Sequence, residues 1–210
     1  MPRAKFNPTT DPYHIAARCI NKEWFHSPTS EVWEIFNDEL YLVQKLFDLK
    51  VFSFVLMSNH FHLLASAPNA DLSLAMNYFL RESSRIILKS NHRINGTFAG
   101  RFFRCRIQSY HHFTTVYKYI YRNPVEAGLC TWAEEYPWST LNGILGFSKL
   151  ILPLEEDKLL FDTGVEPTLK WLNEKPEEFN RNSVRLAIRK PNFKLPLQGK
   201  KPNCLETQLY

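Results

Sequence analysis

VFSFVLMSNHFHLLA, residues 51–65, contains two short apolar runs on either side of a polar connection at 57–59. Apolar runs of this length, joined by so few residues, predict an antiparallel β-hairpin. Side chains alternate between the two faces of a strand, so His60 and His62 should project from one face, about 7 Å apart along the chain. Phe61, between them, should point into the opposite layer.

The sequence on either side of this hairpin predicts the other elements. Apolar residues at spacings of three and four, behind the capping residue Ser30, are typical of a helix. The predicted order is strand 14–20, helix 30–48, strands 51–56 and 60–65, helix 71–92, strand 101–108 and a third helix from Tyr110. The first six elements match the ferredoxin-like plan, an α+β fold whose four-stranded antiparallel sheet carries two helices on one face.

Prolines and alternation add detail to this plan. The opening dozen residues hold three prolines and should be irregular. Strand 101–108 alternates from Phe103 onward, so Phe103 and Cys105 should share a face. Phe98, Phe102 and Phe103 lie among the arginines, where an exposed ring could stack on an unpaired base, but the alternation favours Phe103 in the core. The third helix should end or kink at Asn123-Pro124, because a residue before proline avoids the helical region.

The composition excludes several classes of protein. With 210 residues, 44% of them hydrophobic, the chain is long enough for one globular domain with an appendage. No run approaches the ~18 apolar residues that cross a bilayer, and the N-terminal segment lacks a signal peptide's apolar core. We therefore expect a cytoplasmic protein without a membrane partner. Four cysteines without a C-x-x-C pair exclude a zinc knuckle and a disulfide framework.

Positive charge is concentrated in two segments of a chain whose net charge is +5. Residues 81–106 hold seven basic residues against one acidic residue, and residues 179–202 hold seven basic residues and no acidic one. Each segment alone is typical of a solvated surface, but the two together favour a polyanionic partner. The candidate contacts are one helical stripe, Arg81, Arg85 and Lys89, and three residues on or beside the next strand, Arg101, Arg104 and Arg106.

Three tyrosines lie within YKYIYRNP of the predicted third helix. At about 100° per residue, Tyr117 falls on the apolar face, and Tyr119 and Tyr121 fall on its opposite rims. Asn123 lies one turn after Tyr119 and His112 seven residues before it. The Tyr119 phenol should therefore lie next to an amide and an imidazole. A tyrosine at the rim of a core is also typical of ordinary packing.

The paired imidazoles and this tyrosine together suggest phosphodiester chemistry. His60, His62 and one neutral oxygen ligand would bind a divalent cation, either Mg²⁺ or Mn²⁺, of which Mn²⁺ accepts imidazole more readily. A phenol with a pKa of ~10 is a poor nucleophile unless it is activated, and such a cation would polarise the phosphate that it attacks. An H-x-H pair is also compatible with two half-buried polar side chains on a strand.

These motifs resemble those of one known family. His60-Phe61-His62 resembles the HUH motif, in which U is a bulky apolar residue. YIYRNPVEAGL, residues 119–129, is similar to the tyrosine helix of the small single-tyrosine transposases, and YPWS, residues 136–139, to a segment that follows there. The combination resembles the REP-associated tyrosine transposases, relatives of the insertion-sequence-200-like transposases that act on single-stranded DNA.

This resemblance implies a catalytic domain over 1–146, followed by an extension with a basic tail over 147–210. It implies that hairpin-bearing single-stranded DNA is cut and rejoined through a 5′-phosphotyrosine. Tyr119 would be the nucleophile, and Asn123 would join the two histidines as a metal ligand. Glu126 departs from the family, where a basic residue usually stands. Both monomers and homodimers with shared sites occur among relatives, so either state is expected.

Other functions also fit parts of the pattern. A non-catalytic ferredoxin-like module that binds DNA or RNA, or a domesticated regulator, would use the same fold, but such modules display aromatic residues where this chain has two histidines. A replication initiator or plasmid relaxase shares the chemistry, but the short chain and the tyrosine segment argue against it. A zinc-dependent base deaminase is excluded because no P-C-x-x-C accompanies the histidines.

Overall fold

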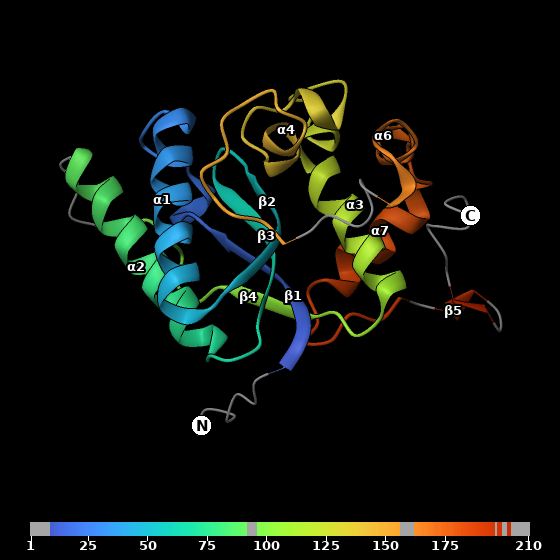
Figure 1. The fold of residues 1–210 in the computed structure, drawn as a ribbon, viewed down its shortest axis with the longest axis horizontal. Coiled ribbons are helices and arrows are strands. Elements are labelled where there is room, and N and C mark those ends of the chain that lie inside the picture. The colour runs from blue at the N-terminus through green and yellow to red at the C-terminus, as the bar shows by residue number, and fades with distance from the viewer. Residues whose placement is uncertain (1–8, 92–95, 156–161, 196, 199–200, 203–210) are drawn as a thin grey trace.

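The computed structural model describes residues 9–91, 96–155, 162–195, 197–198 and 201–202 (Figure 1). At its centre lies a four-stranded sheet in the order β2-β3-β1-β4, and every neighbouring pair is antiparallel. Its strands are β1 (Thr9–Arg18), β2 (Lys50–Leu56), β3 (His60–Ala67) and β4 (Phe103–Arg106). This order confirms the ferredoxin-like α+β fold and the predicted hairpin.

Helices cover both faces of the sheet (Figure 1). On one face lie α1 (Thr29–Phe47) and α2 (Leu72–Ser90), as the ferredoxin-like plan requires. The other face is covered by α3 (Tyr110–Glu126), α4 (Thr140–Ile144), α6 (Val165–Asn173) and α7 (Glu178–Ala187). The short elements are η1 (Ile20–Lys22), η2 (Ala133–Glu135), β5 (Leu197–Gln198) and β6 (Lys201–Pro202). None of the helices in the described ranges is both long enough and apolar enough to cross a bilayer.

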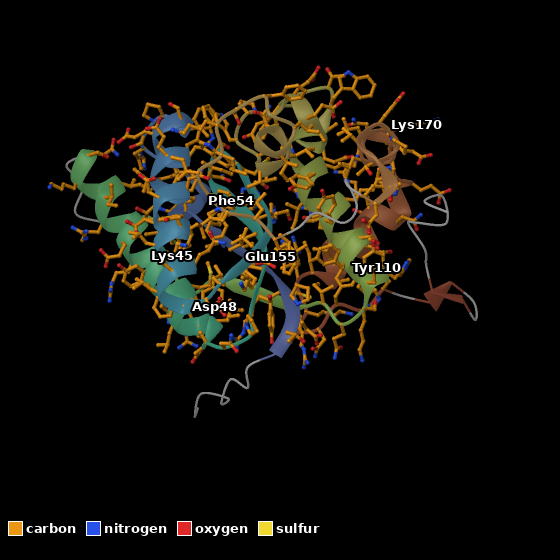
Figure 2. All side chains as sticks on the ribbon, in the orientation of Figure 1. Lys45, Asp48, Phe54, Tyr110, Glu155 and Lys170 are labelled. Carbon is orange, nitrogen blue, oxygen red and sulfur yellow. The ribbon has the colours of Figure 1, made fainter. Side chains whose placement is uncertain are left out.

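Strand alternation divides the buried side chains between two cores. Phe61 and Leu63 of β3 enter the core beneath α1 and α2, together with Phe54 of β2, which is labelled in Figure 2. Leu64 enters the second core, beneath α3 and α7, and His62 shares its face. A sheet that is buried on both faces needs apolar residues at both the odd and the even positions of its strands. This explains the nearly continuous apolar runs of the hairpin.

Several boundaries differ from the sequence prediction: β1 starts and ends earlier than predicted, and β4 is shorter than the predicted strand 101–108. β1 begins at Thr9 and so includes Pro12, which was expected in irregular chain. The register of β1 on β3 shifts between Thr9 and Tyr13, so Pro12 lies at an irregularity of the sheet where its missing N–H is tolerated. Its carbonyl accepts a hydrogen bond from the Ile107 N–H (2.9 Å). α3 includes Pro124 and ends at Glu126, two residues before Gly128, whose φ is positive, as expected for a helix that continues past the proline to a glycine stop.

The expectation that Phe103 belongs to the core is wrong. Its side chain is 65% exposed, although it shares a face with the buried Cys105. The Cys105 thiol lies 3.7 Å from the Ala187 carbonyl of α7, so the helix covers that position of the edge strand. Phe103, two residues earlier on the strand, is left uncovered.

The segment after residue 147 packs on the same core as the segment before it. Trp171 and Leu172 of α6 and Val184 of α7 are buried in the core that also contains Tyr117 and Ile120 of α3. Beyond α7 the chain runs along β4, where backbone hydrogen bonds join Arg106 to Pro191 and Phe193 (both 2.9 Å). The division into residues 1–146 and 147–210 stays a prediction.

Phe36 of α1 should dominate the stability of the first core. Its ring is fully buried and lies within 6.3 Å, between centroids, of the rings of Phe25, Phe54, Phe61, Phe79 and Phe98. We expect Phe36→Ala to lower the free energy of unfolding by about 3–5 kcal/mol in urea titrations, because it leaves a cavity. Leu46→Ala, at a 59% exposed position of the same helix, should change it by less than about 0.5 kcal/mol. Equal losses would contradict this assignment.

Candidate active site

His60 and His62 lie side by side on β3, with ring centroids 5.0 Å apart. Their common face is the one predicted from the strand period. The Asn59 side chain bridges two neighbours: its Oδ1 lies 2.7 Å from His60 Nδ1, and its Nδ2 donates to the Lys22 carbonyl (2.7 Å). The η1 segment is thereby tied to the ring of His60, which leaves Nε2 of that imidazole for another partner.

A third imidazole, which the sequence analysis did not identify, supports His62. His14 on β1 places its Nε2 2.9 Å from His62 Nδ1, and the two rings stack with centroids 5.1 Å apart. His14 is only 2% exposed. The contact follows from the register of β1 on β3, in which Ala16 pairs with His62 and His14 pairs with Leu64. His14 and His62 are therefore diagonal neighbours on one face. No pattern within β1 alone reveals this contact.

Tyr119 is the tyrosine of α3 that meets these histidines. Its ring stands edge-on to His62 and to His14, with centroids 5.6 and 6.1 Å away. Tyr117 and Tyr121 are instead buried in the second core, and the Tyr121 hydroxyl lies 2.9 Å from the Thr140 hydroxyl. The helical wheel therefore separated Tyr119 from Tyr117 correctly, but Tyr121, which it placed at a rim, is fully buried in the core.

The imidazoles beside Tyr119 are not the one that the wheel suggested. His112 packs against Phe193, with ring centroids 5.0 Å apart, and is not among the described residues that line the cleft around Tyr119. The wheel shows which residues share a helix face, but it does not show which strand that face covers. The predicted amide is present, because Asn123 lines the cleft and its Nδ2 donates to the Tyr119 carbonyl (2.7 Å).

The donor atoms in the cleft fit a divalent cation. The Nδ1 atoms of His60 and His62 are both engaged, so each ring has its Nε2 left, and the Asn123 amide has its Oδ1 left. Ligating imidazoles are commonly held in this way through the second ring nitrogen. Within the described ranges, no group of three His, Cys, Asp or Glu side chains is arranged to hold a metal.

Burial sets the protonation states in the cleft. It lowers the pKa of His60 to about 4, assisted by the Arg18 guanidinium, and it holds the pKa of His62 well below its ordinary value. Neutral imidazoles are the form that binds a metal. Burial also raises the pKa of the Tyr119 phenol, whereas the Arg185 guanidinium and the Asn123 side chain oppose that rise.

These side chains open into a cleft of about 690 Å³ between the sheet, α3 and α7. The charged part of its lining is almost entirely basic, and Glu126 is the one acidic residue among the described lining residues. A cleft with this charge attracts polyanions. The basic lining residues are Arg18, Arg101, Lys118, Arg122, Arg181, Arg185 and Arg189.

The predicted DNA contacts separate into two groups. Arg101 lines the cleft, whereas Arg81, Arg85 and Lys89 lie on the exposed side of α2, across the sheet from it. The other two predicted contacts, Arg104 and Arg106, also face away from the histidines. Arg104 donates to the Ser73 hydroxyl of α2 (2.9 Å), and Arg106 pairs with Asp11 (2.8 Å).

Three of the seven cleft cations, Arg181, Arg185 and Arg189, lie in α7 or just beyond it, in a segment that the sequence identified only as part of a basic tail. Glu126 explains how α7 is held. It pairs with Arg122 (2.8 Å) on its own helix and with Arg181 (2.7 Å) on α7. The residue that departs from the family pattern therefore joins the tyrosine helix to the C-terminal extension.

The buried histidines predict a pH dependence of stability. The folded pKa is about 4 for His14 and His60, against 6.5 for an exposed imidazole, so the unfolded chain binds more protons between these values. The free energy of unfolding of the metal-free protein should fall as the pH decreases from about 6.5 towards 4. Urea titrations across this range measure it. His14→Gln, which removes one titrating group, should give a shallower slope, and a slope as steep as wild type would contradict the assignment.

Comparisons with known proteins identify the family to which this chain belongs. A solved structure of a REP-associated tyrosine transposase bound to a REP hairpin matches with a TM-score of 0.57 at 15% identity, covering 75% of this chain and 92% of that one. A transposase from Deinococcus radiodurans gives a TM-score of 0.40 at 16% identity, covering 57% and 95%. No curated protein sequence matches. The family model for IS200-like transposases matches residues 12–123, more than half of the chain. The chain is therefore a member of the IS200-like transposase family.

Proposed function

We propose that this transposase is a metal-dependent endonuclease and strand transferase that cuts and rejoins hairpin-bearing single-stranded DNA through Tyr119. The observation that carries the proposal is the edge-on contact between the Tyr119 and His62 rings, 5.6 Å between centroids, within a basic cleft. It unites a nucleophile, two neutral imidazoles and an anion-attracting surface in a single chain. A fold-level resemblance alone would not supply these three elements together.

The reaction follows from these groups. The Tyr119 phenolic oxygen attacks the phosphorus atom of the scissile phosphodiester, and the bond from phosphorus to the 3′-oxygen breaks. The products are a 5′-phosphotyrosine and a free 3′-hydroxyl, whose oxygen takes up a proton while the phenol loses one. A divalent cation held by His60, His62 and Asn123 would polarise the phosphate and offset the charge that develops on it. Mg²⁺ and Mn²⁺ are the candidates, because imidazole and amide ligands suit Mn²⁺ and phosphate oxygens suit both.

Rejoining reverses the same steps. A 3′-hydroxyl attacks the phosphotyrosine, the bond from phosphorus to the Tyr119 oxygen breaks, and the phenol recovers its proton. Because the tyrosyl ester retains the energy of the original bond, no nucleotide cofactor is needed. Arg185 faces Tyr119 closely enough to oppose the rise of its pKa, so it is suited to stabilise charge on the phenolic oxygen during both attacks.

The proposal that the partner is DNA rests on the basic lining of the cleft and on the structure of a related enzyme. The related REP-associated enzyme was solved with a REP hairpin, and the cleft of this chain carries the basic lining that a nucleic acid requires. The complete set of candidate groups comes from one chain, which fits a monomer, although a homodimer that exchanges helices would assemble the same set. We place the enzyme in the cytoplasm, where its DNA substrate lies.

Tyr119→Phe should abolish covalent capture of DNA. The protein is incubated with Mn²⁺ and a pool of hairpin-bearing single-stranded oligonucleotides with randomised flanks, and the adduct is detected on a denaturing gel. Wild type should give an adduct and Tyr119→Phe none, because the attacking oxygen is gone while the ring remains. Tyr117→Phe, on the same helix but in the core, is the matched control and should keep the adduct. An adduct that persists in Tyr119→Phe and disappears in Tyr117→Phe would overturn the assignment.

His60→Ala should separate chemistry from binding. With the imidazole removed, adduct formation should fall below detection, whereas binding of the hairpin pool, measured by gel shift in EDTA, should stay within about twofold of wild type.

Arg185→Ala should instead weaken binding and reduce its salt dependence, because a cation that contacts phosphate is lost. Equal loss of binding in both variants would favour the non-catalytic binding module over the enzyme.

A further inference from the structure

Phe103 occupies an unusual place for a large apolar side chain. It lies on the edge strand β4, is 65% exposed, and lines the cleft that contains Tyr119. Exposed aromatic rings occur elsewhere, such as Trp24, Trp132 and Phe147, but none of these is among the described residues of the cleft lining. Exposure of an apolar ring inside a basic cleft costs solvation energy unless a ligand covers the ring.

The strand register gives the position of Phe103 relative to the histidines. His62 on β3 pairs with Ala16 on β1, and Ala16 pairs with Phe103 on β4. The three residues form one row across the cleft floor, on one face of the sheet. Neighbouring strands lie about 4.8 Å apart, so the backbones of His62 and Phe103 are separated by about 10 Å.

The middle of this row is open. Ala16 has only a methyl group, so a ligand can lie across β1 between the imidazole and the Phe103 ring. Single strands of DNA advance about 3.4 Å per nucleotide when stacked as in a duplex. A gap of about 10 Å therefore corresponds to at most about three nucleotides.

The surroundings of the ring define the class of ligand. Arg101, two residues before Phe103, and Arg189, just beyond α7, line the same cleft. A basic groove that follows a phosphate chain, combined with an exposed ring, is the arrangement by which proteins hold unpaired nucleotides. A base within a duplex has both faces covered by its neighbours, so only an unpaired base can use the ring.

We propose that Phe103 is a stacking platform for an unpaired nucleobase of the DNA strand, within about three nucleotides of the phosphate that Tyr119 attacks. This inference rests on the proposed function and adds a base subsite to it. Arg101 and Arg189 neutralise the flanking phosphates, and the ring contacts the face of the base. Because every base has such a face, the subsite selects single-stranded over double-stranded DNA without selecting a sequence.

Photocrosslinking tests the position of the base. The full-length protein is bound to an oligothymidylate in which thymine is replaced by 5-iodouracil, irradiated, digested and sequenced by mass spectrometry. Crosslinks should map to Phe103 in wild type. Phe103→Leu should lose that crosslinked peptide. Phe147→Leu, which changes a ring of matching exposure (67%) outside the cleft, should keep it. Crosslinks to the cleft that omit residue 103 would overturn the proposal.

A comparison of two oligonucleotides measures the contribution of stacking. Wild type should bind oligothymidylate more tightly than an abasic oligonucleotide of equal length. Phe103→Leu should reduce this preference by about 5- to 150-fold, whereas Phe103→Trp and Phe147→Leu should retain it. A preference that is unchanged in Phe103→Leu overturns the base subsite and leaves the proposed function standing. If wild type binds neither oligonucleotide, the base subsite is overturned, and covalent capture of the hairpin pool tests the proposed function separately.

Discussion

The pairing of β1 with β3 is the constraint on which the site depends. It makes His14 and His62 diagonal neighbours, and it sets the row that crosses Ala16 to Phe103. A slip of one residue would turn His60 and His62 into the core beneath α1 and bring Phe61 to the cleft. That slip is opposed from both sides, because Phe61 is fully buried among aromatic rings on one face and Leu64 is fully buried on the other. The energy that fixes the site is therefore mostly hydrophobic burial at residues with no chemical role.

A second set of contacts brings Tyr119 to that row. Tyr117 and Tyr121, on either side of it in the helix, are buried anchors that fix the rotation of α3. Glu126, one turn beyond Asn123, then couples α3 to α7 through Arg122 and Arg181. Arg122 is itself buried and also donates to the Leu172 carbonyl of α6 (3.0 Å). A buried guanidinium needs such additional hydrogen bonds to offset its desolvation, and in this cluster they join Arg122 to both α3 and α6.

The sequence predicted what depends on local periodicity and missed what depends on register. Helix and strand patterns gave the order of the elements, the common face of His60 and His62, and the separation of Tyr119 from its neighbours. His14 was missed because its role arises from a residue 48 positions away on another strand. Phe103 was assigned to the core because alternation shows only which residues share a face. Whether α7 covers that face at the sheet edge is decided by tertiary packing. The positive charge of the α7 arginines was evident from the sequence, but charge alone does not show towards which site their side chains point.

The protonation states connect these features in the proposed reaction. The candidate ligands are two neutral imidazoles and an amide, so they leave the charge of a divalent cation uncompensated, and arginines surround them. The phosphate of the DNA is the anion that can balance this charge, so cation and DNA should each favour the binding of the other, as reciprocal linkage requires. Burial keeps the Tyr119 phenol protonated in the free protein, because it raises the pKa above its ordinary value. In the proposed reaction, activation of the Tyr119 phenol would therefore require both the cation and the strand, and a cleft that lacks either one would hold a poor nucleophile.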